Sequence, residues 1–177
     1  ARGYEVRLAE APTDLSGRVT RESKRPGLAD WGRVRDYRMQ QIEKMPHVTI
    51  YRDSLLSAEN VLEFGFEQVV LATGATWRRD GYGRSHHKPI PGLSAAQVFT
   101  PDDLMAERMP STGPVVVYDT EDFYMAGVLA EKLRKAGLET IFVTPSDVAS
   151  AWTSNTLEVG HINKRLRALG VKVITHH

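Results

Sequence analysis

The sequence lacks cysteine, long apolar runs and appreciable net charge, and each absence excludes a class of function. Without cysteine, the chain cannot form disulfides or supply thiolate ligands to a zinc ion or an iron–sulfur cluster. No apolar run approaches the roughly 18 residues of a membrane-spanning helix, and no signal peptide is recognisable. The formal net charge of +1 points to no polyanionic partner. We therefore expect a cytoplasmic protein with no membrane segment.

Signatures of catalysis are also missing. The chain has no Gly-x-Ser-x-Gly nucleophile elbow, no His-Glu-x-x-His zinc motif and no phosphate-binding P-loop. The pairs His86–His87 and His176–His177 have no third metal ligand close by in the sequence, so we expect no metal site. We predict no catalytic residue in these 177 residues and expect the chain to be inactive alone.

A cluster of basic residues between 18 and 38 raises the question of nucleic-acid binding. Such binding requires aromatic residues interleaved with the basic ones, or a known motif. Here Trp31 and Val34 share one face of a helix predicted over 30–45, which indicates packing in a core. We predict no nucleic-acid partner, and interpret the basic residues as a surface facing phosphates or an acidic protein.

Strands and helices alternate along the chain. Apolar, β-branched runs predict strands at 5–11, 47–51, 69–71, 115–118, 140–143 and 171–175. Helices are predicted at 30–45, after the capping residues Ser57 and Thr100, and in the segments that end at Gly137 and Gly170. This order indicates an α/β fold of two Rossmann-like, FAD/NAD(P)-binding-type units with mainly parallel sheets. A linker at 110–114 divides them into partial FAD/ADP-binding-like and NAD-binding-like domains, 1–112 and 113–177.

The first unit carries candidate nucleotide-binding residues. Glu10 stands near the end of the first predicted strand, where an acidic residue binds ribose hydroxyls in dinucleotide-binding units. The glycine fingerprint lies about twenty residues before such an acid, so we expect the unit to lack its opening strand and helix, as a piece of a longer protein would. Gly17 lets a phosphate or ribose approach the backbone, and Arg18 is suited to pair with a phosphate or stack on adenine. An exposed Glu10 and a surface Arg18 are the alternatives.

Residues 66–83 contain the most informative string of the sequence. We predict that Val69–Leu71 forms a buried strand, and the very small side chains after it let a ligand approach Thr73 and Gly74. Trp77 follows, either against adenine or as an anchor at a domain interface.

This string resembles a known family. Ala-Thr-Gly-Ala-x-Trp, extended by Trp77-Arg78-x-Asp80-Gly81 and an Ile-Pro-Gly turn, is similar to the C-terminal half of the trimethylamine, dimethylamine and histamine dehydrogenases. The resemblance implies that an absent N-terminal barrel carries FMN and a four-iron four-sulfur cluster and oxidises an amine. It implies that the first unit binds ADP or an FAD-like adenine nucleotide through Glu10, Gly17 and Arg18. It further implies a homo-oligomer that passes electrons to an acceptor such as a flavoprotein.

The second unit departs from a nicotinamide-binding pattern. The turn over 119–127 contains three acidic residues in place of glycines that would admit a pyrophosphate. We predict that these acids cap the following helix, repel the pyrophosphate and exclude NAD. Two alternatives stay open: a fragment of an NAD(P)H-dependent flavin or dienoyl-CoA-type reductase, and a non-catalytic nucleotide-binding module.

Overall fold

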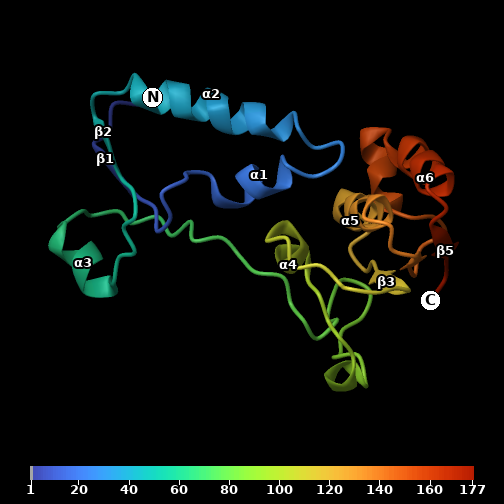
Figure 1. Ribbon diagram of the computed structural model, residues 1–177. Helices are drawn as coiled ribbons and strands as arrows, with labels where there is room; N and C mark the ends of the chain where they lie inside the picture. The colour runs from blue at the N-terminus through green and yellow to red at the C-terminus, as the bar shows by residue number, and fades with distance from the viewer. Residues whose placement is uncertain (1) are drawn as a thin grey trace. The chain divides into compact units, whose positions relative to one another are not determined.

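The computed structural model describes residues 2–177, which divide into two compact units (Figure 1). The first unit contains the residues up to Lys24 together with Leu28–Ala75, and the second contains Arg25–Gly27 and Thr76–His177. This division at residue 76 differs from the linker at 110–114, and the domain limits 1–112 and 113–177 stay a prediction.

The first unit contains a two-stranded parallel sheet. Strand β1 (Val6–Ala9) pairs with β2 (Val48–Tyr51), with Val6 opposite Val48. The helices are α1 (Gly17–Glu22), α2 (Trp31–Glu43) and α3 (Ala58–Glu63). Ser57 caps α3 as predicted: its hydroxyl accepts the Asn60 amide, and the Asn60 side chain accepts the Ser57 amide.

Two predictions for the first unit are wrong. Residues 66–77 form neither helix nor strand, and Val70 and Leu71 are 88% and 82% exposed. A parallel strand must pair its backbone with a neighbour, and among residues 2–177 the sheet of this unit consists only of β1 and β2. Trp31 and Val34 on α2 are also about half exposed and do not pack in a core.

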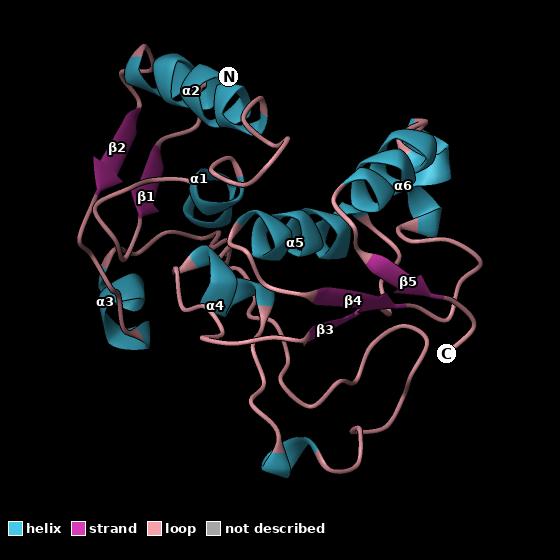
Figure 2. Ribbon diagram, turned by 45° about the vertical axis from the view of Figure 1, so that its right-hand side comes forward, coloured by secondary structure: helices cyan, strands magenta, loops and turns pink. Residues whose placement is uncertain are grey.

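The second unit contains a three-stranded parallel sheet in the order β3-β4-β5 (Figure 2). The strands β3 (Val115–Tyr118), β4 (Thr140–Val143) and β5 (Lys172–Ile174) lie where the sequence predicts them. The remaining elements are η1 (Leu93–Ala95), α4 (Pro101–Met105), α5 (Tyr124–Lys135), η2 (Ala151–Thr156) and α6 (Val159–Ala168). The predicted α/β fold with parallel sheets is therefore confirmed.

Helices α5 and α6 enclose the core of the second unit. Ala130 from α5, Leu166 from α6 and Phe142 from β4 meet in one buried cluster. Leu129 and Leu133, on the same apolar stripe of α5, join a second cluster with α4. Apolar residues at helical spacing place these side chains on the inner faces of α5 and α6. None of the helices within residues 2–177 is long and apolar enough to cross a membrane.

Candidate functional site

Glu10 lies where the two strands of the first unit end. It follows β1 directly, and its backbone N–H donates to the Tyr51 carbonyl at 2.9 Å. Its own carbonyl accepts the Ser54 amide at 2.9 Å. These two bonds fix the backbone of Glu10 at the carboxyl edge of the sheet, where open α/β sheets bind their ligands.

Gly17 begins α1 with an accessible backbone. Ser16 and Gly17 have positive φ angles of 75° and 37°, and a Cβ added at Gly17 would meet nothing within 4 Å. Leu15 just before them is only 7% exposed and anchors this turn. The turn therefore leaves open space beside Gly17, and the approach of a phosphate or ribose to it stays a prediction.

Arg18 connects two of the predicted binding segments. Its Nη2 donates to the carbonyl oxygen of Ala75 at 2.6 Å, and its Nη1 lies 4.0 Å from the Glu22 carboxylate. Gly74, next to Ala75, has a φ of 78° and open space where a Cβ would stand, and Thr73 is exposed. Gly17, Arg18 and the Thr73–Ala75 loop therefore share one end of the first unit.

Trp77 belongs to the second unit. Its backbone N–H donates to Oδ2 of Asp102 at 2.8 Å, and its side chain packs against the cluster that contains Leu104, Met125 and Leu129. This packing lies within the second unit. An anchoring role at a domain interface and a contact with adenine both stay predictions.

The turn after β3 is closed by its own first carboxylate. Asp119 is 3% exposed, and its Oδ1 accepts the amides of Glu121 and Asp122, both at 3.1 Å. Its Oδ2 is buried without a hydrogen-bond partner. Burial raises the pKa of Asp119 to about 6, because the charged form loses hydration.

The prediction that these acids cap the next helix is wrong. Phe123 is the N-cap residue of α5, no side chain caps it, and its first turn contains no acid. Asp122 instead adopts a left-handed conformation with φ of 62°, and its carboxylate accepts the Thr144 hydroxyl at 3.2 Å. The Asp119 carboxylate therefore binds amides of its own turn, and the Asp122 carboxylate binds Thr144 after β4, so neither caps α5.

A loop of the second unit covers the same turn. A Cβ added at Gly83 would lie 2.0 Å from the Thr120 hydroxyl oxygen, so this backbone is in close contact with the turn. The Ser85 hydroxyl donates to the Thr120 carbonyl at 3.5 Å. The space beside Thr120 is therefore filled by the protein's own chain, and two of the turn's amides already have a carboxylate partner.

Asp103 organises a cluster that sequence reasoning missed. Its Oδ2 accepts the Thr100 amide at 2.8 Å and its Oδ1 accepts Nη2 of Arg79 at 2.7 Å and the guanidinium of Arg108. The Arg79 hydrogen bond, the Thr100 amide and Arg108 hold the pKa of Asp103 far below its usual range. Asp103 lies three residues after the predicted cap Thr100, but nothing in the spacing indicated its arginine partners 24 and 5 residues away.

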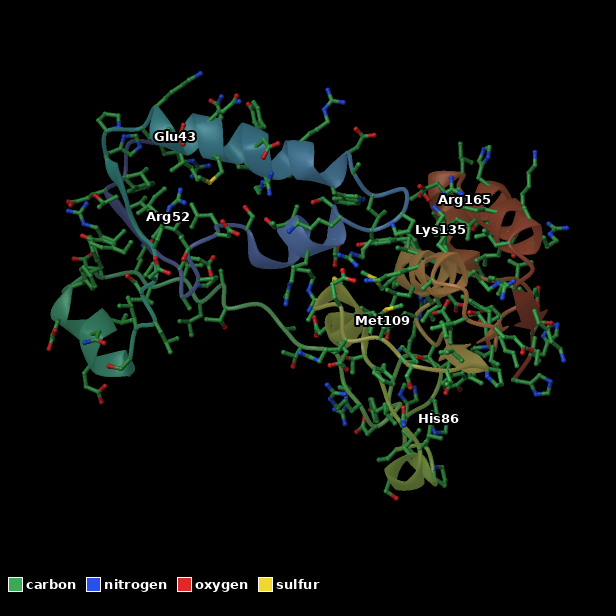
Figure 3. All side chains as sticks on the ribbon, viewed as in Figure 1. Glu43, Arg52, His86, Met109, Lys135 and Arg165 are labelled. Atoms are coloured by element: carbon green, nitrogen blue, oxygen red, sulfur yellow. The ribbon has the colours of Figure 1, made fainter. Side chains whose placement is uncertain are left out.

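The cavity between α5 and α6 contains none of the predicted site residues. It measures about 240 Å³, and its lining includes Tyr124, Val128, His161 and Ile162. Glu131 on its wall is buried and forms ion pairs with Lys135 and Arg165, both labelled in Figure 3, at 2.7 and 3.2 Å. The one buried carboxylate of this cavity is already paired with two cations.

Comparison with known proteins identifies the class of the fold. Residues 99–177 match the family described as the OYE-like second alpha/beta domain. The structure of a 2-naphthoyl-CoA reductase superposes with a TM-score of 0.77 at 20% identity, covering 99% of this chain and 25% of that one, which shows a shared fold. Residues 99–177 therefore form an α/β domain of the OYE-like kind.

Closer matches give the relationship within that class. Histamine dehydrogenase from Rhizobium sp. 4-9 is 53% identical with a TM-score of 0.94, over 98% of this chain and 27% of that one. The 6-hydroxypseudooxynicotine amine oxidase from Pseudomonas geniculata N1 is 43% identical with a TM-score of 0.95, over 99% and 26%. Dimethylamine dehydrogenase from Hyphomicrobium sp. (strain x) is 32% identical over 98% and 24%. The chain is homologous to the dimethylamine and histamine dehydrogenases and spans about a quarter of their length.

Proposed function

We propose that this chain is the nucleotide-binding region of a flavin-dependent amine dehydrogenase. The likeness that carries the proposal is the 53% identity to histamine dehydrogenase over 98% of the chain. Amine oxidation at FMN and electron passage through an iron–sulfur cluster would then take place in a barrel outside these residues. The absence of cysteine means that the cluster's thiolate ligands must be supplied by that part of the protein.

The first unit is proposed as a Rossmann-like site for ADP or an FAD-like adenine nucleotide. The residues present suit such a ligand, because Gly17 and Gly74 leave open space and Glu10 stands at the carboxyl edge of β1 and β2. In this proposal Glu10 accepts hydrogen bonds from the ribose hydroxyls, and the backbones of Gly17, Thr73 and Gly74 approach the nucleotide. Arg18 and Trp77 complete the set of proposed binding residues.

The second unit is proposed to bind no nicotinamide nucleotide. The Asp119 carboxylate takes two of the amides that a pyrophosphate would need, and the Gly83–Ser85 segment covers Thr120. An approaching pyrophosphate would also meet the charges of Glu121 and Asp122. The complete enzyme would therefore pass its electrons to a protein acceptor, such as a flavoprotein. A homo-oligomer located in the cytoplasm is part of the same proposal.

The test of the proposal follows the flavin of the complete protein. Under anaerobic conditions, dimethylamine, histamine and related amines are added to the oxidised enzyme, and NADH and NADPH are added to separate samples. Bleaching of the flavin by an amine, and none by micromolar nicotinamide nucleotide, is expected. Rapid bleaching by NADH without reduction by any amine would instead establish the reductase alternative. Reduction by neither would favour a non-catalytic nucleotide-binding module.

The nucleotide site is tested separately through Glu10. Glu10→Ala in the complete protein should weaken ADP binding by roughly 1–3 kcal/mol, the contribution of a hydrogen bond to a charged group. Isothermal titration calorimetry on protein freed of bound nucleotide measures this difference. Glu5→Ala, which removes an exposed acid just before β1, is the matched control and should leave the affinity unchanged. Equal affinities for wild type and Glu10→Ala would remove Glu10 from the site.

A further inference from the structure

A hydrogen bond from the Arg18 side chain joins the Thr73–Ala75 loop to α1. Residues 66–75 are exposed and form neither helix nor strand. Among residues 2–177, no backbone–backbone hydrogen bond reaches this stretch. The bond from Arg18 Nη2 to the Ala75 carbonyl, at 2.6 Å, therefore connects the loop to the rest of the unit.

The helix that carries Arg18 is itself well anchored. Leu15 before α1 is 7% exposed, and the Thr20 hydroxyl donates to the Leu15 carbonyl at 3.3 Å. From α2, Nη1 of Arg35 donates to the Thr20 hydroxyl oxygen at 3.3 Å. Glu22, at the end of α1, is buried, and its carboxylate lies 4.0 Å from Nη1 of Arg18 as an i,i+4 ion pair on the same helix.

We propose that Arg18 is a positioning residue, whose guanidinium holds the Ala75 carbonyl so that Thr73 and Gly74 present their backbone to the nucleotide. This inference rests on the proposed nucleotide site. It gives Arg18 a different role from a phosphate ligand, because the Nη2 donor is already engaged with a carbonyl of the chain. The open space beside Gly17 and the open space beside Gly74 then belong to one ligand site, because Arg18 holds the Thr73–Ala75 loop next to the start of α1.

Ligands with increasing numbers of phosphates distinguish the two roles. Binding of adenosine, AMP and ADP to the complete protein is measured for wild type, Arg18→Met and Arg18→Lys. A positioning role predicts that Arg18→Met weakens all three ligands by the same factor, roughly tenfold for one lost charge-assisted hydrogen bond. Arg18→Lys should recover most of this loss, since one ammonium N–H suffices for one carbonyl. A loss absent with adenosine and growing toward ADP would overturn the proposal in favour of a phosphate contact, as would unchanged affinity in Arg18→Met.

A ligand-free measurement separates this inference from the proposed function. Chymotrypsin cleavage after the exposed Leu71 should be faster in Arg18→Met than in wild type, because a loop that is held less firmly enters the protease more readily, and it should return toward the wild-type rate in Arg18→Lys. Lys24→Met, which removes an exposed charge just beyond α1, is the control and should leave the cleavage rate and the affinity unchanged. If wild type binds no adenine nucleotide, the proposed function fails, while the cleavage rates still decide whether Arg18 holds the loop. Equal cleavage rates in wild type and Arg18→Met would overturn the positioning role.

Discussion

The two units of the chain differ in how they use their apolar residues. In the second unit, Leu133 and Phe142 are 2% and 0% exposed, within clusters formed by helices on a three-stranded sheet. In the first unit, the described buried apolar residues are Leu15 and Leu28, whereas Leu55 and Leu62 are 85% and 78% exposed. A three-stranded sheet with packed helices provides a core that a two-stranded sheet does not. The residues proposed to bind a nucleotide lie largely in the unit without such a core.

The largest expected effect tests this difference with one substitution in each unit. Leu133→Ala should lower the free energy of unfolding of the second unit by about 2–5 kcal/mol, because it leaves a cavity in a packed cluster. Leu71→Ala, at a residue of the first unit that is 82% exposed, should change the free energy of unfolding of the first unit by less than about 0.5 kcal/mol. Urea unfolding followed by circular dichroism measures both. Similar losses for the two variants would show that Leu71 is packed in solution and that the contrast is wrong.

Asp119, a buried acid of the second unit, gives the next largest expected effect on stability, and this effect depends on pH. The pKa of Asp119 is raised to about 6 from an ordinary value of 3.8, so the folded state holds this proton more tightly than the unfolded state. Its contribution to stability is complete below about pH 4 and is lost as the pH rises through 6, by roughly 3 kcal/mol. The difference in unfolding free energy between wild type and Asp119→Asn should therefore change across pH 4–7. A constant difference would mean that Asp119 titrates normally.

Ion pairs provide a third comparison. Asp103→Asn removes the acceptor of Arg79 and Arg108 from a residue 2% exposed, and should cost about 2 kcal/mol at pH 7. In the first unit, Asp30 and Arg33 are 3.7 Å apart and almost fully exposed, so Asp30→Asn should cost less than about 0.5 kcal/mol. Thermal unfolding of the two variants measures the contrast. Equal costs would show that the Asp103 cluster is as hydrated as the surface pair.

Helix caps give the smallest effect. Both Thr100 and Ser57 form capping boxes, but Thr100 is 3% exposed whereas Ser57 is exposed. Thr100→Ala should cost about 1–2 kcal/mol, since its hydroxyl also donates to Asp103 at 3.0 Å. Ser57→Ala should cost about 0.5–1 kcal/mol, measured by the same unfolding experiment. A larger loss in Ser57→Ala would contradict the view that the first unit is held less tightly.

The sequence predicted the features that depend on local residues. The strands of the second unit follow from their apolar, β-branched runs, and the helix starts follow from the capping residues Ser57 and Thr100. Val69–Leu71 has the composition of a strand, but a strand also needs a neighbour, and composition cannot supply one. The Arg79–Asp103 and Arg18–Ala75 bonds were beyond prediction because their partners are distant in sequence.

Arg25 has a consequence for any attempt to separate the two units. Although residues on either side belong to the first unit, Arg25–Gly27 belongs to the second, where the Arg25 side chain is 6% exposed and pairs with Glu107 at 2.8 Å. Oε2 of Glu107 in turn accepts a hydrogen bond from Nζ of Lys132 at 2.6 Å. A chain truncated to begin at residue 76 would therefore lack Arg25, one of the two cations that pair with Glu107. A peptide spanning residues 20–30, added in trans, is the reagent that could restore it.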